Sequence, residues 1–112
     1  MAYFKPYVPQ FDKRIRVYLD IRDDTFSFIT SNLIEAINPD IIEQDSDGKF
    51  YVILDLIYQN VHKQEDTLTV RFEIIDSPGN EIIMAQDVLE NYDVFKDCMI
   101  LNAGTVKIYH SS

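Results

Sequence analysis

Several residue types are scarce in this sequence of 112 residues, and their scarcity limits what the protein can be. Cys98 is the single cysteine, which excludes an internal disulfide and is typical of a reducing compartment, so we expect a cytoplasmic protein. Three glycines and four prolines argue against low-complexity or disordered sequence. No stretch of about 18 apolar residues and no signal-peptide core is present, so we expect neither secretion by that route nor a membrane span.

Motifs that carry chemistry are also missing. The sequence contains no Gly-x-Ser-x-Gly elbow, no glycine-rich phosphate loop, no His-Glu-x-x-His and no cysteine pair for zinc. His62 has no ligand partner at a suitable spacing, and residues 45–48 form a hairpin turn signal that lacks the glycine and glutamate positions of a calcium loop. We therefore expect no catalytic residue, no metal site and no cofactor.

Charge is unevenly distributed along the chain. The 19 acidic and 10 basic residues give a net charge of -9. Residues 1–22 hold five basic side chains against Asp12 and Asp20, which gives +3, and the remainder holds five against seventeen, which gives -12. A body this acidic repels phosphate backbones, so we expect no nucleic-acid partner. A protein partner with a basic surface fits better.

Apolar residues alternate with others over long stretches, at the spacing of β-strands. Residues 50–58 carry apolar side chains on both faces, interrupted by Asp55, which predicts a central strand covered on both sides. In residues 67–75 apolar and polar positions alternate strictly, which predicts a strand with one wet face. The turn at residues 77–80 then reverses the chain. The expected strands are residues 15–21, 50–58, 67–75, 81–86, 98–101 and 105–110.

Helices are expected at two short stretches. Apolar residues recur at helical spacing over residues 26–37 until Asn38 and Pro39 end the pattern, although residues 26–30 also alternate as in a strand. A capping box at residues 87–90 starts about two further helical turns.

These patterns predict a mostly β fold, an antiparallel β-sandwich of about seven strands with one or two short helices. An α+β fold with helices on one face of an antiparallel sheet is the alternative. The order of central strand, polar loop, alternating strand and Asp-x-x-Gly-Asn turn at residues 76–80 resembles immunoglobulin-like and fibronectin-like sandwiches over about half of the chain. The resemblance carries no functional residue, and the paired cysteines and core tryptophan of true immunoglobulin domains are absent.

The first residues differ from the rest, because Pro6 and Pro9 deny a helix and favour extended backbone. We expect residues 1–13 to form an arm and residues 14–112 to form a single β-rich domain. The arm either packs on its own domain or docks on another chain, and exchange of arms between identical chains would give a homodimer. The expected partner-binding residues are the aromatic anchors Tyr3, Phe4, Tyr7 and Phe11 and the charged residues Lys5, Lys13 and Arg14.

The sequence therefore predicts a non-catalytic protein–protein interaction or structural module with an acidic body and a basic, aromatic arm. A phage or mobile-element protein that blocks a basic partner and a small structural component fit equally well. The alternative is a small hydrolase-like enzyme that uses Asp55 with Cys98 or with His62 or His110. Asp55 interrupts an apolar run of the predicted central strand. Burial of a carboxylate costs free energy unless the group is paired, so the partners of Asp55 decide between the two hypotheses.

Overall fold

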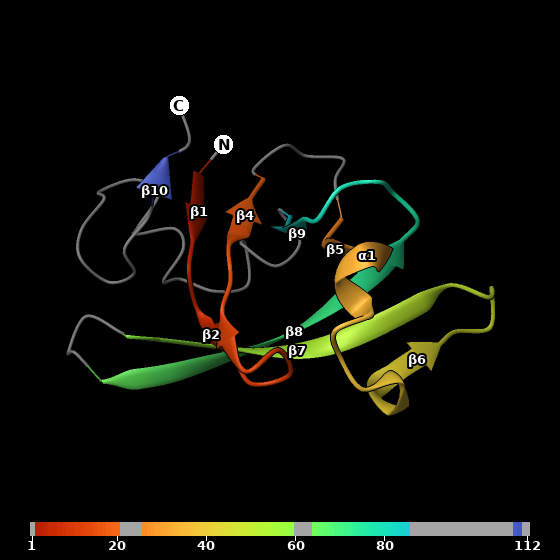
Figure 1. Ribbon diagram of the computed structural model, residues 1–112, viewed down its shortest axis with the longest axis horizontal. Coiled ribbons are helices and arrows are strands. Elements are labelled where there is room, and N and C mark those ends of the chain that lie inside the picture. The colour runs from red at the N-terminus through yellow and green to blue at the C-terminus, as the bar shows by residue number, and fades with distance from the viewer. Residues whose placement is uncertain (1, 21–25, 60–63, 86–108, 111–112) are drawn as a thin grey trace.

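The computed structural model describes residues 2–20, 26–59, 64–85 and 109–110, and strands dominate this part of the chain (Figure 1). The only helices among these residues are a four-residue α-helix and a single 3-10 turn. The prediction of a mostly β fold with few short helices is confirmed. The elements are β1 (Ala2–Phe4), β2 (Tyr7–Val8), β3 (Lys13–Arg14), β4 (Val17–Leu19), β5 (Phe28–Thr30), α1 (Ser31–Ile34), η1 (Pro39–Ile41), β6 (Ile42–Gln44), β7 (Phe50–Gln59), β8 (Glu65–Ile75), β9 (Ile82–Met84) and β10 (Tyr109–His110).

Strands β7 and β8 form the longest hairpin, with nine paired positions along them. Buried and exposed positions alternate on β8, as expected for a strand with one wet face, because neighbouring residues point to opposite faces. The prediction that both faces of β7 are covered holds for one face only. On the outer face Ile53 is 38% exposed, while the Arg71 guanidinium covers the Tyr51 ring at 3.7 Å. The buried side chains of the pair are Val52, Leu54, Leu56, Tyr58, Leu68, Val70 and Phe72.

Residues 2–19 form a second antiparallel hairpin, here called the N-terminal hairpin. Its register is constant from Ala2 opposite Leu19 to Val8 opposite Lys13, so β1 and β2 are two parts of one extended segment that faces β4 and β3. Pro6 separates the two parts, since it has no N–H to donate, although its carbonyl still accepts from the Ile15 N–H at 3.2 Å. Asp12 has a φ of 53° at the turn, a left-handed conformation that aspartate tolerates.

The two parts of this hairpin pair with strands that lie far apart in the order of the sheet. The β1–β4 half continues through β9, β5 and β8 to β7, and β2 then pairs with β7 where Tyr7 lies opposite Ile57. Because β1 and β2 belong to one segment, the sheet closes on itself. A β-sandwich would divide these strands between two sheets. Here they form a single sheet, which is mostly antiparallel and contains the parallel pairs β4–β9 and β5–β8.

The core lies inside this closed sheet. Strands β1, β2, β4, β5, β7, β8 and β9 contribute to it, and its largest members are at most 1% exposed. Burial of side chains of this size is the main term that favours folding. The largest fully buried side chains are Phe4, Phe72, Ile29, Leu54, Leu56, Ile82, Met84, Val8, Val17, Val52 and Thr30.

The helix and the strand predicted within residues 26–37 are both partly confirmed. Residues Phe28–Thr30 form β5, and Ser31–Ile34 then form the single turn of α1. Strand β9 is also confirmed within the expected residues 81–86, but β5 lies between it and β8, so the turn at residues 77–80 does not make a hairpin of neighbouring strands.

Some expectations fall on parts of the chain outside the described residues. These are the second helix, the strand over residues 98–101 and most of the final strand, of which Tyr109–His110 is described as β10 and pairs with β1. No helix in the described ranges has the length and apolar character needed to cross a membrane.

Candidate interaction site

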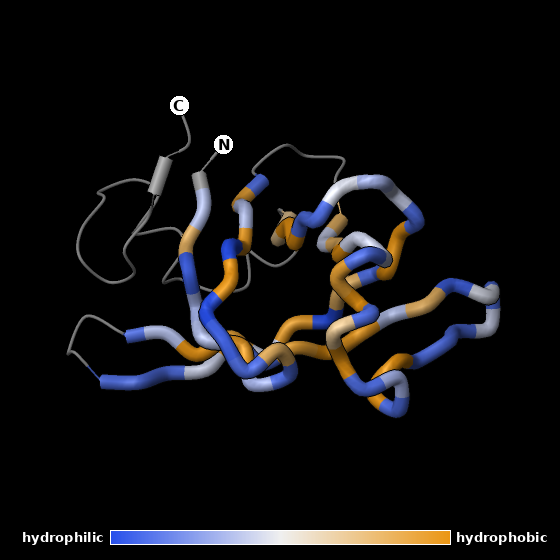
Figure 2. The backbone as a smooth tube through the Cα atoms, viewed as in Figure 1, coloured by the Kyte–Doolittle hydropathy of each residue, from blue (hydrophilic) through white to orange (hydrophobic). Residues whose placement is uncertain are grey.

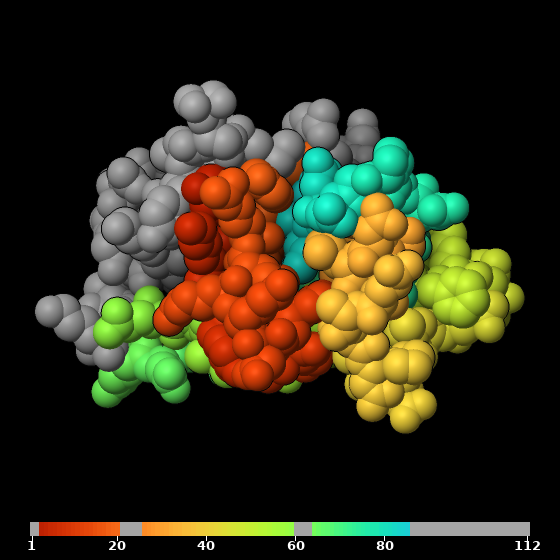
Figure 3. Space-filling view, viewed as in Figure 1, coloured from red at the N-terminus to blue at the C-terminus, as the bar shows by residue number. Residues whose placement is uncertain are grey.

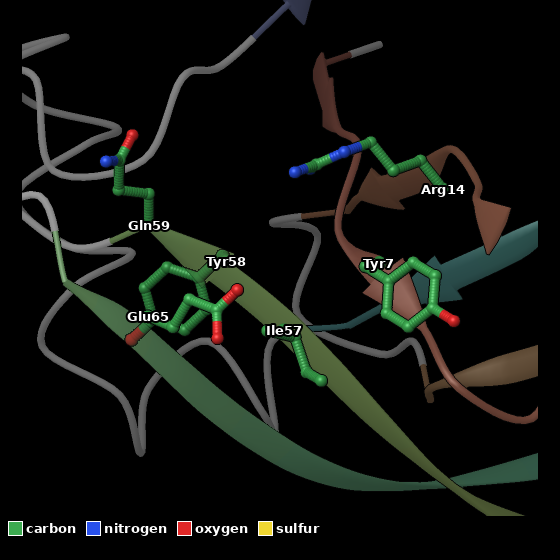
Figure 4. Close-up of a pocket in the computed structure, with 6 residues that line it drawn as sticks. All are labelled: Tyr7, Arg14, Ile57, Tyr58, Gln59 and Glu65. Atoms are coloured by element: carbon green, nitrogen blue, oxygen red, sulfur yellow. The ribbon is translucent and has the colours of Figure 1, made fainter. Parts of the chain in front are cut away.

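A groove opens where the N-terminal hairpin leaves β7. Strand β2 pairs with β7, but β1, beyond Pro6, pairs with β4 and β10 instead. The two segments therefore diverge and leave a hollow of about 580 Å³ between the hairpin and the far end of β7 and β8 (Figure 4). The groove is lined by Tyr7, Arg14, Ile57, Tyr58, Gln59 and Glu65.

The register of the strands explains why these residues face one another. Tyr7 lies opposite both Arg14 in β3 and Ile57 in β7, so these three side chains share one row. Gln59 lies opposite Glu65 at the end of the long hairpin and forms the other wall. Sequence reasoning named Tyr7 and Arg14 but missed Gln59 and Glu65, because their wall exists only where two strands part.

The charged groups of the groove are not neutralised by one another. The Arg14 guanidinium donates through Nη1 to the Lys5 carbonyl oxygen at 3.0 Å, which holds the side chain against the hairpin. Among the described residues, neither Arg14 nor Glu65 takes part in an ion pair, and both residues are exposed. The groove thus presents a cation on one wall and an anion on the other.

Tyr7 contributes its ring to the groove and directs its hydroxyl elsewhere. The hydroxyl donates a hydrogen bond to the Asp12 carboxylate, and in Figure 4 it points away from Gln59 and Glu65. That hydrogen bond, together with desolvation and the negative charge of Asp12, raises the pKa of Tyr7 above its ordinary value. The phenol therefore stays neutral at physiological pH and offers an apolar surface to the groove.

The expected partner-binding residues occupy three different environments. Phe4 is 1% exposed and belongs to the core, and Tyr3 is 9% exposed beside Tyr18. Phe11 is half-buried against the core. The remaining positively charged residues, Lys5 and Lys13, are exposed. Within one chain the arm packs on its own domain, and an arm-exchanged dimer would contain the same strand pairings between two chains.

Asp55 is held by neighbours on two sides. Its Oδ1 accepts from the Thr69 hydroxyl at 2.8 Å, directly across the β7–β8 pair, and its Oδ2 accepts from Gln10 Nε2 at 3.1 Å. The Gln10 Oε1 in turn accepts from the Asp55 backbone N–H at 3.2 Å, so this amide side chain takes the place of a neighbouring strand. The Arg71 guanidinium, on the neighbouring strand β8, lies over the ring of Tyr51.

The other candidate catalytic residues are Cys98, His62 and His110. Cys98 and His62 lie outside the described residues, and His110 is described as part of β10, opposite Ala2. No group of three or more His, Cys, Asp or Glu residues in the described ranges is arranged to hold a metal ion.

At the opposite end of β7 the chain makes a tight turn over residues 45–49. The Asp45 Oδ1 accepts from the backbone N–H groups of Asp47 at 3.0 Å and Lys49 at 2.9 Å, and Gly48 has a φ of 83°. Desolvation alone would raise the pKa of Asp45, but the Lys49 N–H, the Tyr51 hydroxyl, the Asp47 N–H and the Lys49 charge outweigh it, and the pKa is lowered. The hairpin turn expected here is confirmed.

The N-terminal hairpin and the segment from α1 to β7 differ in charge. The hairpin carries four exposed cations, whereas the segment from α1 to β7 carries four exposed carboxylates. Figure 2 shows hydrophilic backbone at both places, with apolar strands between them. The exposed cations are Lys5, Lys13, Arg14 and Arg16, and the exposed carboxylates are those of Glu35, Asp40, Glu43 and Asp47.

A groove with apolar side chains and a few charged groups on its walls is typical of a binding site rather than of packed core. The described residues thus form a closed β-rich sheet with a groove beside the N-terminal hairpin. Comparison of the chain with protein-family models, with curated proteins and with solved structures finds no match.

Proposed function

We propose that the protein is a non-catalytic protein–protein interaction or structural module that acts in the cytoplasm and associates with itself. The observation that supports this most strongly is the groove, in which Arg14 and Glu65 lack ion-pair partners among the described residues. Exposed charges without a partner among the described residues are available to a second chain, where they steer association as well as hold it.

The surroundings of Asp55 favour this proposal over the hydrolase-like alternative. Both carboxylate oxygens accept hydrogen bonds from Gln10 and Thr69, and the Gln10 amide also satisfies the Asp55 N–H. A buried or half-buried polar group that is fully hydrogen-bonded stabilises the fold. Asp55 therefore joins the N-terminal hairpin to β7 as a structural residue.

The charge distribution indicates the kind of partner. The net charge of -9 and the exposed carboxylates suit a protein with a basic surface and oppose nucleic acid. A phage or mobile-element protein that blocks a basic partner and a small structural component both remain within this proposal. A pull-down from cell extract at physiological salt would recover such a partner.

Self-association is proposed to include exchange of the arm, residues 1–13, between two chains. The arm buries Phe4 and Val8, and Pro6 and Pro9 limit the conformational entropy that it loses when it is ordered. The pairing partners of the arm lie in β3, β4 and β7, and the same partners are available on a second copy.

A cross-link can distinguish an exchanged arm from an intramolecular one. Tyr7 and Arg14 are Cα partners in the hairpin, so cysteines at these positions are within reach of a disulfide. The variant Tyr7→Cys/Arg14→Cys in a Cys98→Ser background should give covalent dimers on a non-reducing gel if arms are exchanged. Cross-linked monomers alone would contradict the exchange, and a parental chain that sediments as a monomer at tens of micromolar would contradict self-association altogether.

A further inference from the structure

The groove and the turn over residues 45–49 lie at opposite ends of β7. The chain leaves the turn at Lys49, runs the ten residues of β7, and reaches the groove at Gln59. At about 3.3 Å per residue the strand separates the two by roughly 30 Å. In Figure 1 the turn is at the right-hand end of the long axis and the ends of β7 and β8 that form the groove are at the left.

The turn is a rigid projection. Asp45 uses one carboxylate oxygen to fix the backbone N–H groups of Asp47 and Lys49, so little conformational entropy remains to be lost when another molecule contacts the turn. Figure 3 shows this region as a protrusion at the right-hand extremity of the molecule. Asp47 and Lys49 are both exposed on this turn.

The charges of Asp47 and Lys49 in the turn are opposite in sign to those of Arg14 and Glu65 in the groove, respectively. The Asp47 carboxylate forms no ion pair among the described residues, and Arg14 keeps most of its donors after bonding the Lys5 carbonyl. The Lys49 ammonium lies 3.6 Å from Glu73 Oε1 with 58% of its side chain exposed, which leaves it able to approach Glu65 of another copy. A guanidinium and a carboxylate form the strongest pair of this kind when two parallel hydrogen bonds are possible.

We propose that copies of this chain associate head to tail, with the 45–49 turn of one copy seated in the groove of the next. This inference rests on the proposed self-association and names a second surface for it. Asp47 pairs with Arg14 across the contact, and Lys49 faces Glu65. Because the two surfaces are different and lie at opposite ends, the contact is heterologous, and repetition builds an open chain or a ring rather than a closed dimer.

Two charge reversals test the contact, each of which disables one surface and leaves the other intact. Arg14→Glu disables the groove and Asp47→Lys disables the turn. Either variant alone should weaken association at least about tenfold, measured by sedimentation velocity over a concentration series, and the loss should be larger at low salt. The charge-exchanged variant Arg14→Glu/Asp47→Arg should regain association, because the pair is restored with its signs reversed.

An equimolar mixture of the two single variants gives the sharpest result. The unchanged groove of the Asp47→Lys chain can bind the unchanged turn of the Arg14→Glu chain, and the reversed turn of the first chain complements the reversed groove of the second. The mixture should therefore regain the association that each variant alone has lost. A mixture that behaves as its separate components do would overturn the proposal.

Matched controls separate this contact from general charge effects and from arm exchange. Arg16→Glu makes the same charge change in the N-terminal hairpin outside the groove lining, and Asp40→Lys does so for an exposed carboxylate outside the turn. Both should associate like the parental chain, and an equal loss in them would overturn the proposal. A closed dimer that persists in Arg14→Glu and Asp47→Lys would overturn head-to-tail association while leaving the arm-exchanged homodimer in place.

Discussion

The two hairpins of this protein are both antiparallel, but they have different structural roles. The β7–β8 hairpin keeps nine consecutive paired positions and forms one wall of the core along the long axis. The N-terminal hairpin keeps one register but is interrupted at Pro6, so that its halves join different strands. An uninterrupted hairpin provides a frame, whereas an interrupted one can close a sheet and open a groove at the same point.

The largest effect is expected from truncating matched core residues in the two hairpins. Phe72 in β8 is fully buried and Phe4 in β1 is 1% exposed, so Phe72→Ala and Phe4→Ala should each lower the free energy of unfolding by about 3–5 kcal/mol. Urea unfolding followed by circular dichroism measures both. Similar losses and a single transition would show that the hairpins form one cooperative unit, whereas a loss under about 1 kcal/mol for Phe4→Ala would contradict the closure of the sheet.

A smaller effect is expected at the joint between the hairpins. Gln10→Ala removes the two hydrogen bonds that connect Gln10 to Asp55 and leaves the Asp55 N–H without its acceptor. The free energy of unfolding should fall by about 1–3 kcal/mol. Gln44→Ala, at an exposed position of β6, is the control and should change stability by less than about 0.5 kcal/mol. Equal effects of the two variants would show that Gln10 does not join the hairpins.

The turn that precedes β7 offers a test of backbone conformation. A Cβ added at Gly48 would meet no atom closer than Gln44 Nε2 at 3.9 Å, so space is available, but the φ of 83° is unfavourable for any residue with a Cβ. Gly48→Ala should therefore destabilise the protein by about 1 kcal/mol through backbone strain. Gly79→Ala is the comparison, since Gly79 has no positive φ. A smaller loss of stability in this variant would show that the effect at Gly48 comes from its backbone conformation.

The smallest effect concerns the turn of the N-terminal hairpin and its dependence on pH. Because the pKa of Tyr7 is raised in the folded state, the stability contributed by its bond to Asp12 is present below the ordinary pKa of 10.0 and is lost as the pH rises through the folded value. The titration curve of Tyr7 is obtained by subtracting the ultraviolet titration curve of the Tyr7→Phe variant from that of the parental chain. Asp12→Asn should lower its pKa, and an unchanged titration would contradict the assigned hydrogen bond.

The long hairpin could be predicted from sequence because its information is local. Alternation along residues 67–75 is sufficient to define which face of β8 is buried, and the turn residues before β7 carry their own signature. The second half of the N-terminal hairpin also alternates, over residues 15–21. Its first half does not, since Tyr3, Phe4, Tyr7 and Val8 place apolar groups without a period of two around Pro6. The sequence shows the aromatic character of that half but does not specify its pairing within the same chain.

What could not be predicted depends on contacts between distant segments. Strand β9 follows β8 after a short turn, yet β5 lies between them, parallel to β8 and antiparallel to β9, and no local pattern specifies such a neighbour. The groove also depends on two segments that part from each other, so Gln59 and Glu65 gave no sign of their role. Gln10 was overlooked for the same reason, since its importance comes from Asp55, forty-five positions along the chain.

Closure of the sheet by residues 2–19 also sets an order of events during synthesis. The N-terminal hairpin precedes all of its outside partners in the chain, which are Ile57 for β2, Ile83 and Met84 for β4, and Tyr109 and His110 for β1. Its own turn can form early, but the ring cannot be completed until these later segments have left the ribosome, because loop closure must precede long-range pairing. Until then, Phe4 and Val8 are apolar side chains without a core, and the nascent chain has its greatest opportunity to pair with a neighbouring copy.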